Sequence, residues 1–185
     1  MRLLQEIQNW RSIRRFDNTT VPDEKVLSVL EAGRRAPSWE NIQPCHFVVV
    51  REPDIKEKLS RLSMNQKHVA RAPVVIVCCG DLGAWSPDRQ RQALRELREK
   101  GGAVALTDEV IEEVFLKKPV FAPQLLGEKA ILVRTVEQVS IAVAFMCLEA
   151  VHQGLGCCIV GAFGNKLTET NLELYEEIRK DLNLP

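Results

Sequence analysis

The stretch APSWENIQP, residues 36–44, separates a segment of helical periodicity from a short apolar run. Pro37 and Pro44 restrict the backbone and lack amide donors, so neither a helix nor a central strand is expected to pass through it. The short polar side chains between them, Ser38 and Asn41 among them, can bond either backbone or a ligand. Taken alone, such a stretch is more typical of a solvated connector than of a binding site. Its neighbours along the chain decide between the two interpretations.

Apolar periodicity predicts the elements on both sides of this stretch. A helix is expected from Pro22 to Pro37, because apolar residues and a glycine recur there at helical spacing. Three apolar runs are typical of buried strands: HFVVV (46–50), VVIVCC (74–79) and CCIVGAF (157–163). Further helices are expected at 2–9, 55–63, 88–100, 108–118, 136–153 and 170–182, the last with capping-box spacing between Thr170 and Glu173. Three strands among five or more helices indicate a mixed α/β or α+β fold.

The length of 185 residues suits a single domain over residues 1–185. The charged segment 81–134 is either an insertion or lid within that domain or an ordinary solvated surface; the pattern favours neither. Lys plus Arg (25) equals Asp plus Glu (25), so no nucleic-acid partner is expected.

The N-terminus lacks the pattern of a leader peptide, and the longest apolar run, 141–148, is far shorter than the ~20 residues of a membrane span. A cytoplasmic protein without membrane contact is therefore expected. None of the six cysteines forms a C-x-x-C pair, and no metal site is predicted. Reduced thiols packed as small apolar groups are expected instead.

The segment WRSIRRF, residues 10–16, is the second candidate for a binding function. In an extended chain Ser12 and Arg14 would share one face, and Arg11 and Arg15 the other. Guanidinium groups beside a hydroxyl suit a phosphate or the edge of an anionic heterocycle. An exposed basic patch without a ligand is the commoner explanation for such a segment.

Together, these motifs resemble the nitroreductase family of FMN-dependent oxidoreductases. The resemblance is carried by R-S-x-R-x-F near the N-terminus and by A-P-S-x-x-N-x-Q-P after the following helix. NQKHVARAPVVIV (65–77), GLGCCIVGAF (154–163) and the terminal LNLP continue it in the family's order. It implies an α+β fold with a central mixed, mainly antiparallel sheet flanked by helices, built as an intertwined homodimer. FMN is the implied cofactor, with NADH or NADPH as co-substrate.

The same resemblance implies roles for nine residues. Arg11, Ser12 and Arg14 should face the phosphate, ribityl chain and pyrimidine edge of FMN, and Asn65 should bond the flavin ring. Pro37, Ser38 and Asn41 should come from the other subunit and line the isoalloxazine. Gly161 and Ala162 should pass close to flavin N5. The prolyl stretch would then be a rigid wall of a shared flavin site.

Elementary chemistry agrees with these roles. Reduced flavin carries negative charge near N1 and O2, and a cation there stabilises it; Arg14 is the candidate, with Lys67 or His68 as helpers. No catalytic side chain is needed, because the cofactor carries the electrons. The predicted activity is two-electron transfer from NAD(P)H to a nitroaromatic, quinone or similar conjugated small-molecule acceptor.

Two departures from the family pattern leave alternatives open. Trp10 stands where many relatives have a further arginine, and the chain ends at Pro185 where relatives generally continue into a basic tail. A flavin-binding carrier or sensor with little turnover is one alternative. The other is a relative with different flavin chemistry, such as flavin destruction, dehalogenation or dehydrogenation.

Overall fold

The computed structural model describes residues 3–161, 177, 180 and 181. Its contacts divide the chain into two compact units, one of Met1–Val29, Phe47–Val77 and Cys147–Pro185, the other of Leu30–His46 and Cys78–Met146. In chain order the elements are α1 (Gln5–Asn9), α2 (Asp23–Arg35), η1 (Trp39–Asn41), β1 (Cys45–Val50), α3 (Pro53–Leu62), α4 (Lys67–Arg71), β2 (Val75–Gly80), η2 (Leu82–Trp85), α5 (Pro87–Gly101), α6 (Asp108–Val110), η3 (Ile111–Phe115), η4 (Pro123–Leu126) and α7 (Glu128–His152).

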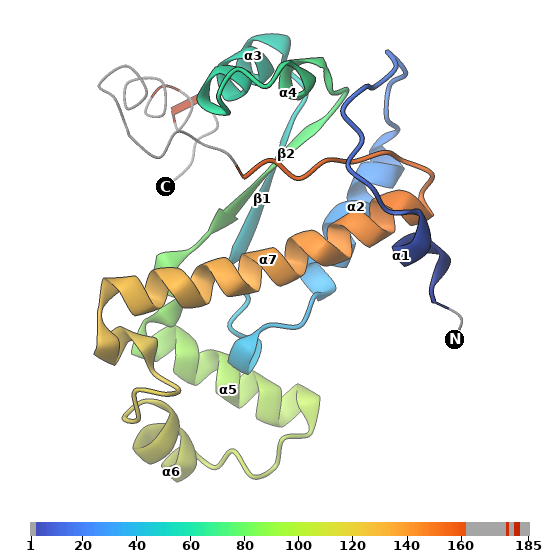
Figure 1. Cartoon of the computed structure of the whole chain (residues 1–185). Helices are drawn as coiled ribbons and strands as arrows, with labels where there is room; N and C mark the ends of the chain where they lie inside the picture. Colours follow the sequence, from blue (N-terminus) through green and yellow to red (C-terminus); the bar gives the residue numbers. More distant parts are fainter. Residues whose placement is uncertain (1–2, 162–176, 178–179, 182–185) are drawn as a thin grey trace. The chain divides into compact units, whose positions relative to one another are not determined.

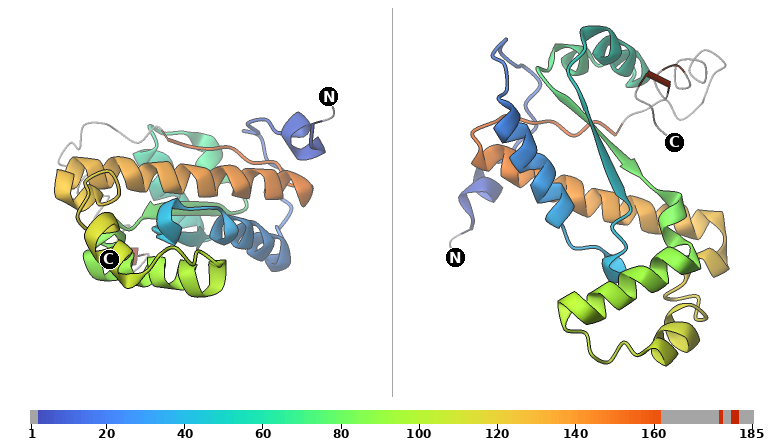
Figure 2. Two further views of the ribbon diagram at one scale, coloured as in Figure 1. Left: turned by 90° about the horizontal axis from the view of Figure 1, so that it is seen from below. Right: turned by 180° about the vertical axis from the view of Figure 1, so that it is seen from behind.

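The described sheet consists of β1 and β2, which pair and run in opposite directions (Figures 1 and 2). Both strands were predicted to within one residue at each end, because their β-branched runs have few other stable conformations. The third predicted strand, 157–163, is wrong for its described part. There the backbone makes one isolated parallel bridge, between Ser12 and Cys157. An apolar run needs a partner over several residues to form a strand, and this segment has one over a single bridge.

The core of the first unit lies where α3 and α4 pack against the end of β1 and the start of β2 (Figure 1). Val50, Leu59 and Val69 are buried there, with further valine, isoleucine and leucine side chains packed around them. Pro53 begins α3, a position where its missing amide costs nothing. Apolar side chains from α3, α4 and both strands thus form one cluster.

The second unit contains the charged segment 81–134 as helices. Ala84, Trp85 and Ala93 form its core with Ile42, and the indole of Trp85 donates a hydrogen bond to the hydroxyl of Thr135 at 2.9 Å. This segment therefore supplies part of a core in addition to solvated charge. Whether it also acts as a lid stays a prediction.

Helix α7 is longer than predicted, because it begins eight residues before the apolar pattern at 136. Its buried side chains form one narrow stripe through Thr135, Gln138, Ala142, Met146 and Ala150. It is the one helix in the described part of the chain that is long and apolar enough to cross a membrane by those two measures, which core helices of soluble proteins also satisfy. The run 141–148 alone did not indicate this length.

Candidate functional site

The arginine segment, residues 10–16, is extended and is attached through its backbone to the segment that leads to Gly161. The amide of Ile13 donates to the carbonyl of Cys157 at 2.9 Å, next to the bridge between Ser12 and Cys157. A Cβ on Gly156 would lie 3.0–3.1 Å from three side-chain atoms of Ile13, so glycine permits this approach. Two motifs about 140 residues apart are thereby brought side by side.

The charged side chains of this segment have no partner within the described structure. Arg11 and Arg14 are exposed, and neither makes a hydrogen bond or ion pair with a described residue. Elsewhere many arginines are paired, for example Arg91 with Glu112 and Arg51 with Asp23. The arginine segment therefore offers unused guanidinium donors on a backbone that is held in place.

Two other predicted residues of the first unit are also open. Gly161 is exposed, and a Cβ there would meet no atom within 4 Å. Asn65 lies in the turn after α3 with a left-handed backbone (φ 59°), and its exposed amide makes no hydrogen bond to any described residue. The structure thus does not join Asn65 to the arginine segment by a hydrogen bond. Ala162, Thr170 and Glu173 lie outside the described residues.

The possible helpers differ in their surroundings. Lys67 is exposed at the start of α4. His68 is half-buried, and its Nε2 atom is inaccessible and lacks a hydrogen-bond partner within the described structure. A buried ring nitrogen without a partner costs free energy, which distinguishes His68 from an ordinary surface histidine.

The prolyl turn, residues 36–44, belongs to the second unit and is fixed by its own hydrogen bonds. The hydroxyl of Ser38 accepts from the amide of Gln43 at 3.0 Å, and the side-chain carbonyl of Asn41 accepts from the Gln43 side chain at 3.1 Å. Glu40, Asn41 and Gln43 all have positive φ, at 53°, 57° and 47°. Each such residue costs roughly 1–2 kcal/mol, so the turn persists only because other contacts hold it. Pro37 is exposed at its start.

Those contacts involve residues that the sequence did not single out. Gln138, which is 4% exposed on α7, accepts from the amide of Trp39 at 2.8 Å. The guanidinium of Arg134 lies 4.3 Å from the centre of the Trp39 ring, a cation–π contact. A glutamine near the start of an apolar helical pattern gives no sign of such a role, so only the folded chain reveals it.

A second group of hydrogen bonds centres on Gln90 of α5, which is fully buried. Its side-chain amide donates to Oε2 of Glu40 at 2.5 Å and to the carbonyl of Phe121 at 2.9 Å. It accepts from the amide of Gln124 at 3.0 Å. Glu40 also accepts from the Trp39 indole at 2.7 Å. Burial raises the pKa of Glu40, and these two hydrogen bonds and Arg134 oppose that rise.

The six cysteines are all half-buried and form no disulfide with one another. Burial raises the pKa of Cys78 to about 12. Cys157 differs, because a hydrogen bond with Cys147, assisted by Trp10, lowers its pKa to about 7. Trp10 therefore contacts the thiol beside the Ser12 bridge, a role not expected from its place in the motif. No group of three metal-binding side chains occurs among the described residues.

Comparison with known proteins decides the family. The model of the nitroreductase family matches residues 7–185. This chain belongs to that family. Over 72 residues it is 47% identical to an NADH dehydrogenase of Thermus thermophilus, which covers 39% of this chain and 35% of that protein. It is 27% identical over 164 residues to an FMN reductase (NADPH) of Bacillus subtilis, covering 89% of this chain and 55% of that protein.

A solved nitroreductase-like protein of Streptococcus mutans has the same fold, with a TM-score of 0.72 at 20% identity. That likeness covers 97% of this chain and 79% of the other. The predicted α+β, nitroreductase-like fold is therefore confirmed. The matched stretches span less than two thirds of the Thermus and Bacillus relatives.

Proposed function

We propose that this protein is an FMN-dependent oxidoreductase that takes two electrons from NADH or NADPH and passes them to a nitroaromatic, quinone or similar conjugated acceptor. The observation that carries the proposal is the family match over 7–185, which includes the arginine segment and the prolyl turn. The Bacillus relative is named an FMN reductase (NADPH), which supports this choice of cofactor and electron donor.

The residues of the arginine segment fit the proposed cofactor. Arg11 and Arg14 are unpaired among the described residues, and Ser12 is held by the backbone bridge. Such a donor set suits a phosphate and a ring that gains negative charge. FMN, when bound, supplies the electron chemistry. Arg14 would stabilise the added charge, and Arg11 and Ser12 would hold the phosphate and ribityl chain.

Three further residues would shape the ring site. Gly161 leaves its backbone open, with no atom within 4 Å of where a side chain would begin, and a flat ring can approach such a backbone closely. Asn65 offers a free amide within the described structure and would bond the ring edge. Ala162 would continue the open backbone beyond Gly161.

The proposed assembly is a homodimer in which Pro37, Ser38 and Asn41 of one subunit line the flavin of the other. Support comes from α7, where only 22% of the most apolar window is buried. Leu132, Val133, Val136, Ile141 and Phe145 are exposed on this helix. Exposed apolar side chains in this number are typical of interaction sites, and a second copy of the chain would cover them. Sedimentation of the flavin-loaded protein should give twice the chain mass of 20.9 kDa.

The test begins with the absorption spectrum of the purified protein. We expect flavin absorption, bleached under anaerobic conditions by NADH or NADPH and restored by a quinone or nitroaromatic with steady turnover. Parallel titrations with the two nucleotides give the preferred donor. Arg14→Gln should weaken FMN binding about tenfold to hundredfold, because a hydrogen bond to a charged group contributes roughly 1.5–3 kcal/mol. A colourless protein that does not bind added FMN would overturn the proposal.

A further inference from the structure

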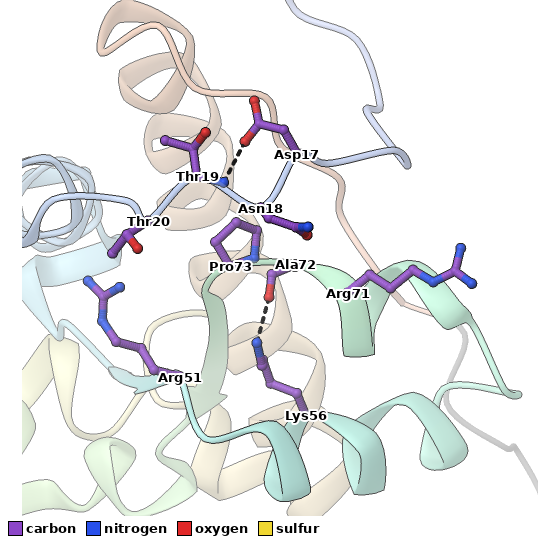
Figure 3. A pocket seen from close by; sticks show the side chains of 9 residues that line it. All are labelled: Asp17, Asn18, Thr19, Thr20, Arg51, Lys56, Arg71, Ala72 and Pro73. Atoms are coloured by element: carbon purple, nitrogen blue, oxygen red, sulfur yellow. Dashed lines mark hydrogen bonds between the residues drawn. The ribbon is translucent and has the colours of Figure 1, made fainter.

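A cavity of about 330 Å³ lies in the first unit, between the loop that follows the arginine segment and the junctions of α3 and α4 with the sheet (Figure 3). None of the nine predicted site residues lines it. Its volume is at the lower end of the roughly 300–1,000 Å³ of ligand pockets. The lining residues are Asp17, Asn18, Thr19, Thr20, Arg51, Lys56, Arg71, Ala72 and Pro73.

Lys56 is the unusual member of this lining. At 8% exposure it is the one charged residue, among those described, that is almost completely buried. It lies on the buried stripe of α3 with Leu59, Ser60 and Ser63, and not on a solvated face. Its ammonium group donates to the carbonyl of Ala72 at 2.8 Å. It forms no ion pair with any described carboxylate.

A buried ammonium with one neutral acceptor is incompletely satisfied. The group has three N–H donors, and the carbonyl of Ala72 accepts one of them. Burying a charge is costly unless an opposite charge compensates it. The arrangement is therefore that of a cation positioned for an anion, with the cavity as the space for that anion.

Other donors line the same space. The Arg51 guanidinium uses one terminal nitrogen for the Val21 carbonyl (3.0 Å) and Asp23 (2.6 Å), which leaves its other N–H groups available. Figure 3 shows Arg51 extending toward Thr20, whose hydroxyl makes no hydrogen bond to a described residue. The guanidinium of Arg71 points away from Lys56.

The lining carries three cations, Arg51, Lys56 and Arg71, against one carboxylate, Asp17. Asp17 is turned to its own loop, where it accepts from the amide of Thr19 at 2.9 Å (Figure 3). That bond lowers the pKa of Asp17, so the carboxylate is ionised at neutral pH. Glu52, outside the lining, accepts from the Arg51 amide at 3.2 Å and lies within the field of Lys56. With Asp23, the partner of Arg51, three acids balance the three cations in number, but none of these acids forms an ion pair with Lys56.

We propose that this cavity binds the dianionic phosphate group of a phosphate monoester or of inorganic phosphate, with Lys56, Arg51 and Thr20 as its donors. A tetrahedral group with several acceptor oxygens can use donors that converge from an ammonium, a guanidinium fork and a hydroxyl. A planar carboxylate offers two oxygens and matches this set less well. The inference does not rest on flavin binding.

The experiment is calorimetric titration of the purified protein, with and without saturating FMN, with inorganic phosphate, adenosine 2′-monophosphate, adenosine 5′-monophosphate and acetate in a phosphate-free buffer. We expect saturable binding of phosphate and weak or absent binding of acetate. A preference for either nucleotide over inorganic phosphate identifies the source of the phosphate group. Loss of phosphate binding on FMN saturation, or equal binding of acetate, would overturn the proposal.

Variants of one helix supply the control. Lys56→Met keeps the length of the buried stem and should weaken phosphate binding about tenfold to hundredfold. Lys58→Met removes a lysine that instead pairs with Glu177 and Asp181, and should leave phosphate affinity unchanged. Thr20→Val lies in an exposed loop, so it reports on binding even where Lys56→Met does not fold; a severalfold loss is expected. The phosphate site would be refuted if Thr20→Val bound phosphate with unchanged affinity and Lys56→Met both folded and bound phosphate with unchanged affinity.

Discussion

The prolyl turn and the arginine segment both carry residues predicted to contact one cofactor. They differ in whether their polar side chains have hydrogen-bond partners within the described structure. In the turn, the described polar groups are bonded to one another or to residues of α5 and α7, as in the bonds from Trp39 to Gln138 and from Gln90 to Glu40. In the arginine segment, the backbone is held at Ser12 and Ile13, while Arg11 and Arg14 have no described partner.

This difference separates two ways of preparing a site. A turn with three positive φ values is maintained by contacts that exist without a ligand, so it is organised before any ligand arrives. Unpaired guanidinium groups gain their partners only from a ligand. Changes around the turn should therefore act on the stability of the folded chain, and changes to the arginine side chains should act on binding.

The largest expected effect is at Gln90. Gln90→Leu has a similar volume but removes the partner of one Glu40 oxygen, of the Phe121 carbonyl and of the Gln124 amide in a buried place. Each such loss costs roughly 1–3 kcal/mol, and we expect the free energy of unfolding to fall by about 2–4 kcal/mol in urea denaturation. Gln92→Leu, exposed on the same helix, should change it by no more than about 0.5 kcal/mol. If the two variants were equally stable, the turn would not depend on Gln90.

Several elements were accessible from the sequence for a physical reason. The strands at 45–50 and 75–80 follow from β-branched runs, and α5 follows from helical periodicity between Pro87 and Gly101. The prolines at 37 and 44 correctly indicated that neither an α-helix nor a strand passes through the turn, which contains only the short 3-10 helix η1. These are local properties, set by the allowed backbone conformations and by the spacing of side chains on one face.

The contacts that hold the prolyl turn could not be predicted from such local properties of the sequence. Gln90 and Glu40 are fifty residues apart, and both stand in polar stretches where an exposed side chain is the default. Lys56 is a similar case, because a lysine in a charged helix is normally solvated, and only the packing of α3 buries it. The prediction of a third strand was wrong because an apolar run alone does not show whether several residues of a partner strand lie beside it.

A smaller effect is expected where the arginine segment meets the glycine motif. Gly156→Ala would place a methyl group 3.0–3.1 Å from Ile13, so Ile13 must shift by a few tenths of an ångström. We expect a loss of about 1–2 kcal/mol in the free energy of unfolding, as for overpacking elsewhere, because the backbone here is held firmly.

Gly161→Ala is the matched variant, because its methyl group would meet no atom within 4 Å. It should change stability by less than about 0.5 kcal/mol while weakening FMN binding measured by flavin fluorescence. The pair thus separates the fold from the site within one segment. Equal stabilities for the two variants would show that the contact between Gly156 and Ile13 is not tight.

The smallest expected effect is a pH dependence that distinguishes Glu40 from an exposed glutamate. Burial raises the pKa of Glu40 in the folded protein, so the folded chain keeps this proton to higher pH than the unfolded chain does. Between the unfolded and folded pKa values, raising the pH therefore favours unfolding. The stability of the protein relative to its Glu40→Gln variant should fall as pH rises through this interval and then level off.

At Glu31 the expected dependence of stability on pH has the opposite sign. Arg34 and Arg35 lower its pKa to about 2, so the stability that its charge contributes is present above the ordinary glutamate pKa of 4.5 and is lost as pH falls toward 2. Relative to Glu31→Gln, the protein should thus gain stability as pH rises from about 2 to 4.5, below the interval in which Glu40 loses it. Urea denaturation of all three proteins from pH 3 to 8 measures both slopes, and acidic groups common to them cancel in the differences. If the stability difference rose with pH for both glutamates, Glu40 would be solvated like Glu31. The turn would then not be closed and internally bonded, and it would not differ from the arginine segment in this respect.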